Sequence, residues 1–316
     1  MKKIIKSLVS LSLIWMIVSC EKDEITSTTS NKKQFDMNSF FSQVAPTRQS
    51  FNITAGQVQQ IQGAKGTIVR FNANSFKRSN GQILNSGTVT IILQEMLTAP
   101  EMILANKTTT SNGQLLKSGG QILLKAYLGN EELLVNAASK PTVEIPTKTG
   151  DAMNLFYGTV KANDSLVGDT SVNWNQDTTT VNVVQDSARS GGYYNFKIDS
   201  FSYINCDKFY DQNPKTDVKI TVPATFVDSN TAVFVYFTAI NSVARVYKFD
   251  KTNNSFILDG GYAVPIGMNV KIVLVAKKGT QYYYEIKSTT ITSNFNTSMN
   301  PSSSDLNSIK TAISSM

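Results

Sequence analysis

The chain has 316 residues, of which 41% are hydrophobic and 17% are charged, so it is long enough for two domains and apolar enough to bury hydrophobic cores. This composition excludes an intrinsically disordered chain. The formal net charge is +7, and the sequence contains no histidine. The absence of histidine excludes Ser-His-Asp and Cys-His nucleophilic sites, HExxH zinc peptidases and histidine-ligated metals.

Residues 1–19 have the organisation of a secretory signal peptide. Lys2, Lys3 and Lys6 precede an apolar run at 8–18. A membrane-spanning helix needs about 20 apolar residues, so this shorter run predicts a cleaved signal peptide. Its removal takes three lysines and lowers the net charge to +4. The remaining basic residues are scattered along the chain, so we expect no nucleic-acid partner.

The end of this signal resembles a bacterial lipobox. In Ile17-Val18-Ser19-Cys20 a small residue precedes a cysteine. The resemblance implies that Cys20 receives lipid, such as palmitate, and becomes the new N-terminus. Acyl chains contribute about 0.8 kcal/mol per buried methylene, so two or more would hold the protein on a membrane. The alternative is a signal peptide that merely contains a cysteine.

The residues after the cysteine resemble the surface-export signal of Bacteroidota lipoproteins, which is a lysine followed by two acidic residues. Here these are Lys22, Asp23 and Glu24. The resemblance implies an outer-membrane protein that faces the cell exterior; the alternative is a charged tether on a protein of the periplasmic face. Residues 25–33 are rich in Ser, Thr, Asn and Lys and predict a flexible spacer. We therefore interpret 20–46 as a lipid-anchored tether, with one or two helical turns at 37–44.

From 47 to 149 the pattern indicates an antiparallel β-sandwich. Short β-rich runs alternate with glycine and asparagine turn signals, and Pro100 opens a helical insert at 99–105. The segments GAKGTIVRFNANSF, NGQILNSGTVTIILQE, TTTSNGQLLKSGGQILLKAY and VEIP follow one another in this range. They resemble a domain of Bacteroidota surface lipoproteins that is distantly similar to the ZU-type β-sandwich. The likeness implies a fold and no activity. The strands expected here are at 66–71, 87–93, 121–127, 132–135 and 142–145.

Residues 150–190 are polar and lose regular apolar spacing, which predicts a linker or an extended segment on a domain surface. Three tripeptides in it resemble the O-glycosylation sequence of Bacteroidota, in which Asp precedes Ser or Thr. The resemblance implies glycan on Ser165, Thr178 and Ser187. Chance matches in a segment rich in Ser and Thr are the alternative.

Residues 191–295 predict an immunoglobulin-like sandwich, because seven short strands fit this length. A hairpin is expected at 249–256, and Leu306, Ile309 and Ile313 predict a helix in the tail 296–316, capped by Ser303 or Ser304. The expected fold class is all-β, with two tandem antiparallel β-sandwich domains and a short C-terminal helix. The expected strands are at 193–203, 217–222, 232–239, 244–249, 256–258, 269–276 and 282–290.

Few residues have the pattern of a catalytic or metal site. Glu95 and Glu101 could form the carboxylate pair of a glycosidase, although a capping or pairing role is favoured for Glu95. Cys206 has no histidine to activate it, so we expect it to be a small buried hydrophobic residue. Lys117 and Ser118 would point to opposite faces of a strand, which excludes a Ser-Lys dyad. Asp199, Asp207 and Asp211 could offer oxygens to calcium, but solvated loop acids are the favoured interpretation.

Three consecutive tyrosines are the strongest candidates for ligand contact. Tyr282 and Tyr284 would share one face of a strand and Tyr283 would take the other, so one tyrosine surface could meet a sugar ring or a protein. The alternative, half-burial on a sheet with hydroxyls at its rim, is favoured.

The sequence predicts a membrane-anchored, cell-surface lipoprotein that acts as a non-catalytic binding or adhesion module. Its partners would be the membrane, through the lipid on Cys20, and a glycan or an envelope protein. We expect no catalytic residue, no metal and no cofactor. A carboxylate-based envelope hydrolase and a passive structural component of the envelope are the alternatives.

Overall fold

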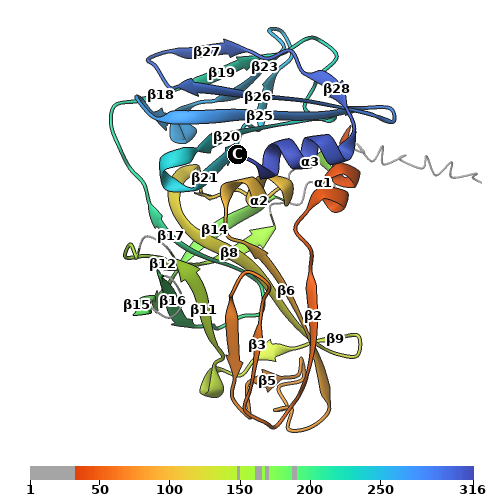
Figure 1. The fold of residues 1–316 in the computed structure, drawn as a ribbon, viewed down its shortest axis with the longest axis vertical. Coiled ribbons are helices and arrows are strands. Elements are labelled where there is room, and N and C mark those ends of the chain that lie inside the picture. The colour runs from red at the N-terminus through yellow and green to blue at the C-terminus, as the bar shows by residue number, and fades with distance from the viewer. Residues whose placement is uncertain (1–32, 148–149, 161–165, 168–170, 187–190) are drawn as a thin grey trace, which may run out of the picture. The chain divides into compact units, whose positions relative to one another are not determined.

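The structure is a computed structural model that describes residues 33–147, 150–160, 166–167, 171–186 and 191–316. Residues Lys33–Met316 form one compact unit. Most described residues lie in strands, and three short α-helices accompany them (Figure 1). The predicted all-β sandwich fold is confirmed.

The first sandwich consists of two facing sheets. In spatial order, one sheet contains β14 (Val172–Thr180), β12 (Asn154–Val160), β17 (Tyr203–Phe209), β8 (Gln114–Leu128), β6 (Thr88–Met96) and β2 (Gln49–Thr54). The other contains β15 (Asn182–Asp186), β16 (Gly191–Lys197), β11 (Thr142–Thr147), β4 (Ile68–Phe71) and β3 (Gln59–Gln62). The remaining strands are short. β5 (Phe76–Lys77) pairs with β10 (Leu134–Val135), and β1 (Lys33–Gln34) pairs with β13 (Leu166–Val167). β7 (Thr110–Ser111) and β9 (Glu131–Glu132) both pair with β8.

Alternating side chains of both sheets form the first core. On β6, Val89, Ile91 and Leu93 point inward and are fully buried, while Thr88 at the strand's start is exposed. Val143 and Ile145 on β11 meet them from the opposite sheet. This alternation with a period of two residues is what the sequence showed at 87–93 and 142–145.

The second sandwich has the same two-layer construction. One sheet contains β22 (Lys248–Asp250), β23 (Ser255–Leu258), β19 (Val218–Thr221) and β27 (Phe295–Ser298), the last of which runs parallel to β19. The other contains β21 (Ser242–Arg245), β20 (Thr231–Phe237), β25 (Asn269–Lys278), β26 (Gln281–Thr290) and β28 (Ser302–Ser304). β18 (Lys215–Thr216) pairs with β24 (Val264–Pro265) at its margin, and the expected hairpin forms between β22 and β23.

The structure differs from the predicted division at 150–190. Instead of a linker, this range contains β12, β14 and β15, and both sheets of the first sandwich use it. Leu155, Phe156 and Trp174 are fully buried there. The single strand expected at 193–203, at the start of the second domain, is replaced by two strands, β16 and β17. Both belong to the first sandwich, which therefore ends at Phe209. The polar composition of β14 reflects its place at a sheet edge, where alternate side chains such as Thr178 face solvent.

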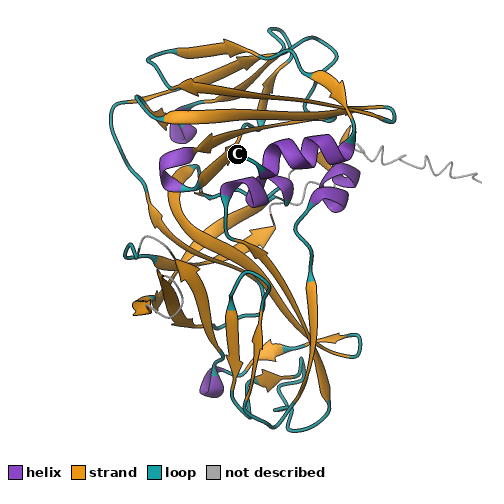
Figure 2. Cartoon of the chain, viewed as in Figure 1, coloured by secondary structure: helices purple, strands orange, loops and turns teal. Residues whose placement is uncertain are grey.

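Three helices form a third core that contacts both sandwiches. They are α1 (Asn38–Val44), α2 (Ala99–Leu104) and α3 (Leu306–Ser314), and Figure 2 shows them grouped together in purple. Their buried residues pack on one side against β6 and β8 of the first sandwich and on the other against β20, β21 and β25 of the second. The sheet containing β20 is consequently buried on both faces. The described residues also form the 3₁₀ turns η1 (Ala137–Ser139), η3 (Thr238–Ile240) and η4 (Gly260–Tyr262).

The helix starts follow local capping chemistry. Pro100 lies in the first turn of α2, as the sequence pattern indicated, and Thr98 and Glu101 form a capping box there that was not predicted. At α3 the predicted cap is corrected: Asp305 caps the helix, and its carboxylate accepts a hydrogen bond from the Ser308 N–H at 2.9 Å. Ser303 and Ser304 instead lie in β28. Aspartate is as good an N-cap as serine and stands directly before the helix.

The Asn241 side chain connects the second sandwich to the first through three hydrogen bonds. Asn241, which follows η3 with a left-handed backbone (φ 49°), accepts a hydrogen bond from the Ala99 N–H at 2.7 Å. Its amide donates to the carbonyls of Leu97 at 3.0 Å and Ser118 at 3.3 Å. Thr109 adds a second link, since its hydroxyl oxygen accepts from the Val243 N–H at 2.7 Å.

We expect Asn241→Gly to lower the free energy of unfolding by about 1.5–4.5 kcal/mol, because three hydrogen bonds worth about 0.5–1.5 kcal/mol each are lost. Glycine retains access to the left-handed backbone, so the loss isolates the side chain. This change in the free energy of unfolding is measured by urea titration, with the fluorescence of Trp174 as the signal. Asn254→Gly is the matched control, since Asn254 has φ 46° in the β22–β23 turn and lies outside this junction. Equal effects of the two substitutions would contradict a connecting role.

Candidate functional site

The residues predicted to anchor and export the protein lie outside the described part of the chain. These are Cys20, Lys22, Asp23 and Glu24. Of the predicted glycosylation sites, Ser165 and Ser187 also lie outside it, whereas Thr178 is exposed on β14. None of the helices in the described ranges has the length and apolarity of a membrane span.

The three consecutive tyrosines are half-buried and pack inside the molecule. Tyr282 contacts Phe40 of α1 with ring centroids 5.6 Å apart, and Tyr284 packs against the same third core. Tyr283 faces the interior of the second sandwich, where its ring meets Phe226 edge-on at 5.5 Å. The three tyrosines are therefore half-buried, which was the favoured interpretation, and their rings contribute mainly to packing.

Glu95 holds a loop of the first sandwich. It is 1% exposed, and its carboxylate accepts hydrogen bonds from the main-chain N–H groups of Lys65 at 2.9 Å and Thr67 at 3.0 Å. The Gln49 amide adds a third at 2.9 Å. A Cβ atom at Gly63 would lie 2.5 Å from this carboxylate, so only glycine fits there. Glu95 is thus engaged in fixing residues 63–67 against β6.

Glu101 is engaged in a similar way. Its carboxylate accepts from the N–H groups of Leu97 at 2.9 Å and Thr98 at 3.2 Å, which caps α2, and it forms an ion pair with Lys65. The Lys65 ammonium also donates to the Glu95 carbonyl at 3.2 Å. A pocket of about 430 Å³ opens beside both acids, with Lys310 on its rim. The two glutamates thus lie at one pocket, but their carboxylate oxygens already accept hydrogen bonds from main-chain N–H groups, and Glu101 also pairs with Lys65.

Cys206 and Asp207 are buried side by side at a bulge where β17 pairs with β8. Burial, together with the neighbouring Asp207, raises the pKa of the Cys206 thiol well above its usual value, so the reactive thiolate is disfavoured. Burial also raises the pKa of the Asp207 carboxyl, against the opposing effects of Ser118, Asn205 and the Gly119 N–H. The Asn205 amide donates to Asp207 at 2.6 Å. Burial therefore favours the neutral form of the Asp207 carboxyl over its ionised form.

The remaining candidates are separated from one another. Asp199 forms an ion pair with Lys140, and Asp211 forms one with Lys215 at 2.6 Å. Lys117 pairs with Asp151 at 2.7 Å while the Ser118 hydroxyl donates to Asn205 at 3.3 Å. Within the described ranges, no three Cys, Asp or Glu side chains gather closely enough to hold a metal ion.

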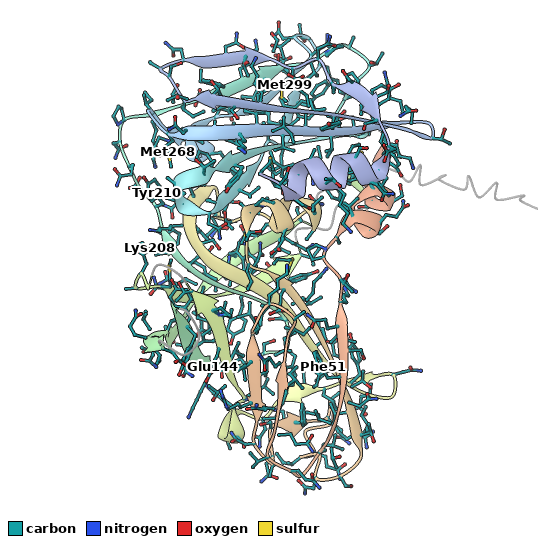
Figure 3. All side chains as sticks on the ribbon, viewed as in Figure 1. Phe51, Glu144, Lys208, Tyr210, Met268 and Met299 are labelled. Atoms are coloured by element: carbon teal, nitrogen blue, oxygen red, sulfur yellow. The ribbon has the colours of Figure 1, made fainter. Side chains whose placement is uncertain are left out.

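A groove at the margin of both sandwiches is the main surface feature with exposed aromatic residues. It has a volume of about 240 Å³ and is lined by the turn before β8, the end of β17, β18 and the segment around η4. Figure 3 labels Tyr210 here, where the chain passes to the second sandwich. Phe209, which lines the groove, is 41% exposed, and Tyr262 beside it is 38% exposed. We call this feature the Phe209 groove.

Sequence reasoning did not identify the Phe209 groove. Phe209, Lys215 and Tyr262 are far apart in the chain and form no spaced motif. Gly260-Gly261 marked a loop, which is the one local signal that the neighbouring Tyr262 would be exposed.

Comparison with known proteins assigns no family to the chain. No protein-family model matches the sequence. No curated protein matches it either.

The buried carboxyl of Asp207 leads to a test of stability against pH. The unfolded chain ionises this group near pH 3.9, but the folded protein retains the proton to higher pH because its pKa is raised. The stability that this proton gives the folded protein is therefore complete below about pH 4, and it is lost as the pH rises toward the pKa of the folded protein. We expect Asp207→Asn to reduce this loss, so that the free energy of unfolding differs less between about pH 4 and about pH 7 in the variant than in the natural protein.

Urea titrations at pH 4 and pH 7, followed by Trp174 fluorescence, measure this difference. Trp174 is fully buried and is the only tryptophan after residue 15, so it reports unfolding alone. Asp217→Asn, on an exposed carboxyl, is the control and should leave the pH dependence unchanged. An unchanged pH dependence in Asp207→Asn would contradict a raised pKa of the Asp207 carboxyl.

Proposed function

We propose that this protein is a lipid-anchored lipoprotein of the outer membrane that faces the cell exterior and acts as a non-catalytic binding or adhesion module. The anchor is supported by the signal-like residues 1–19, the lipobox-like residues before Cys20 and the export-like triplet at 22–24. The observation that carries the binding role is the Phe209 groove, which leaves two aromatic side chains exposed on an otherwise well-packed protein.

The placement of the reactive groups supports binding over catalysis. Glu95 and Glu101 accept main-chain hydrogen bonds, and the Cys206 thiol is buried with a raised pKa. A general acid or base needs an accessible group within hydrogen-bond reach of a substrate. Glu95 instead holds the loop at 63–67, Glu101 caps α2, and Cys206 is buried in β17.

The attachment of the N-terminal segment also suits an anchored module. Phe35 lies 4.5 Å below the buried guanidinium of Arg245 on β21, which is a cation–π contact. Phe40 and Phe41 of α1 continue into the third core, where Phe41 meets Phe234 at 6.1 Å. Force applied through the tether would therefore pass the two-residue strand β1 and then reach both sandwiches at their junction.

Lipidation is tested by metabolic labelling with a palmitate analogue. We expect the natural protein to be labelled and Cys20→Ala to lose the label, because no lipid acceptor remains at that position. Cys206→Ala is the matched control and should retain full labelling, since Cys206 is buried and its thiol is protonated. Label that persists in Cys20→Ala would refute this anchor.

Surface exposure is tested by adding protease to whole cells. Replacing Lys22, Asp23 and Glu24 together with alanine should protect the protein from digestion, because it would then stay on the periplasmic face. Lysed cells provide the control for protease sensitivity. Unchanged digestion of the variant in whole cells would show that these residues do not direct surface export.

A further inference from the structure

The Phe209 groove places two exposed aromatic side chains beside a pair of opposite charges. In the described part of the chain the exposed large hydrophobic residues are Val58, Leu134, Val160, Phe209 and Tyr262, and only the last two are aromatic. Phe209 lines this groove, and the Tyr262 ring packs over Gly113 at its rim, although the two come from different sandwiches. Leaving an aromatic face in water is unfavourable, so two at one place point to a ligand that covers them.

The groove is held rigidly. The Phe209 ring meets the buried Phe156 edge-on at 5.6 Å, and the next residue, Tyr210, donates its main-chain N–H to the Leu115 carbonyl at 2.9 Å. On the opposite rim the Tyr262 ring lies over Gly113, where a Cβ atom would be only 3.2 Å from two ring carbons. A preformed site loses little conformational entropy when it binds.

The charges of the groove favour a neutral ligand. Asp211 and Lys215 form an ion pair at 2.6 Å, and both line the groove. Their side chains are 68% and 34% exposed, so their remaining acceptors and donors are open to solvent. The exposed Gln114 adds an amide that can donate and accept. A phosphate or a carboxylate would meet Asp211, whereas hydroxyl groups can bond to all three side chains.

The size of the groove indicates a small ligand element. Its volume of about 240 Å³ is below the range of about 300–1,000 Å³ typical of sites for drug-sized molecules. A single six-membered ring of a longer chain suits such a site better than a folded protein loop.

We propose that the Phe209 groove binds one ring of a neutral polysaccharide. The apolar C–H face of the ring stacks on Phe209, Tyr262 borders it on the other side, and the equatorial hydroxyls bond to Asp211, Lys215 and Gln114. This inference rests on the proposed binding function and gives it a ligand class. Stacking supplies affinity without charge, and the polar side chains orient the ring.

Affinity electrophoresis tests this proposal with the purified chain from residue 21 onward. Native gels contain one of four neutral polysaccharides: dextran, glycogen, xylan or mannan. We expect at least one polymer to retard the protein, and Phe209→Ala and Tyr262→Ala each to weaken that retardation at least about tenfold, because each removes an aromatic face. Leu134→Ala is the control, since Leu134 is 47% exposed outside the groove.

A third variant protects the test against misfolding. Gln114→Ala changes an exposed side chain and should also weaken the retardation, while the fluorescence of Trp174 shows that all variants are folded. The proposal is overturned if none of the four polymers retards the protein, or if folded Phe209→Ala and Gln114→Ala bind as well as the natural chain. Retardation only by an anionic polymer such as alginate would equally overturn it. Loss of lipidation in cells would instead refute the anchor and leave these gels unaffected.

Discussion

The packing of three short helices between the two sandwiches is the interaction on which the rest of the structure depends. α1, α2 and α3 come from the beginning, the first third and the end of the described chain, and none could form a stable helix alone because each is shorter than about 12 residues. They persist because Phe41, Ile103 and Ile309 are buried in one shared core. The same burial covers the outer face of the sheet that contains β20, so the two sandwiches and the helices stabilise one another.

This arrangement explains where the polar residues of the interior lie. Asn241 and Thr109 satisfy main-chain groups that the junction would otherwise leave buried without partners, and Glu95 and Glu101 do the same for the loop and the helix start beneath it. An unpaired buried N–H or carbonyl costs about 1–3 kcal/mol, so these side chains are needed to close the structure. Their oxygens and nitrogens are thereby unavailable for chemistry on a substrate.

The Phe209 groove is a consequence of the same junction. β8 and β17 extend from the first sandwich to the second, and Leu115 of β8 belongs to the second core. Where these strands end, the segment around η4 approaches the turn at Gly113 and leaves a recess between them. A groove lined by residues of both sandwiches requires that they hold a fixed relation, which the helices supply.

Local sequence patterns determined most individual elements of this protein. The alternation at 87–93, Pro100 in the first turn of α2 and the turn residues at 250–255 each produce the expected strand, helix or hairpin, because neighbouring residues decide them. The continuous apolar runs of β20 and β25 also contain the signal of a sheet buried on both faces. Only the tertiary structure decided the assignment of 150–209 to the first sandwich, the packing partners of Tyr282 and Tyr284 in the third core, and the placing of Phe209 and Tyr262 at the same groove. Those outcomes depend on partners distant in the chain, and an edge strand as polar as β14 carries no pattern that distinguishes it from a linker.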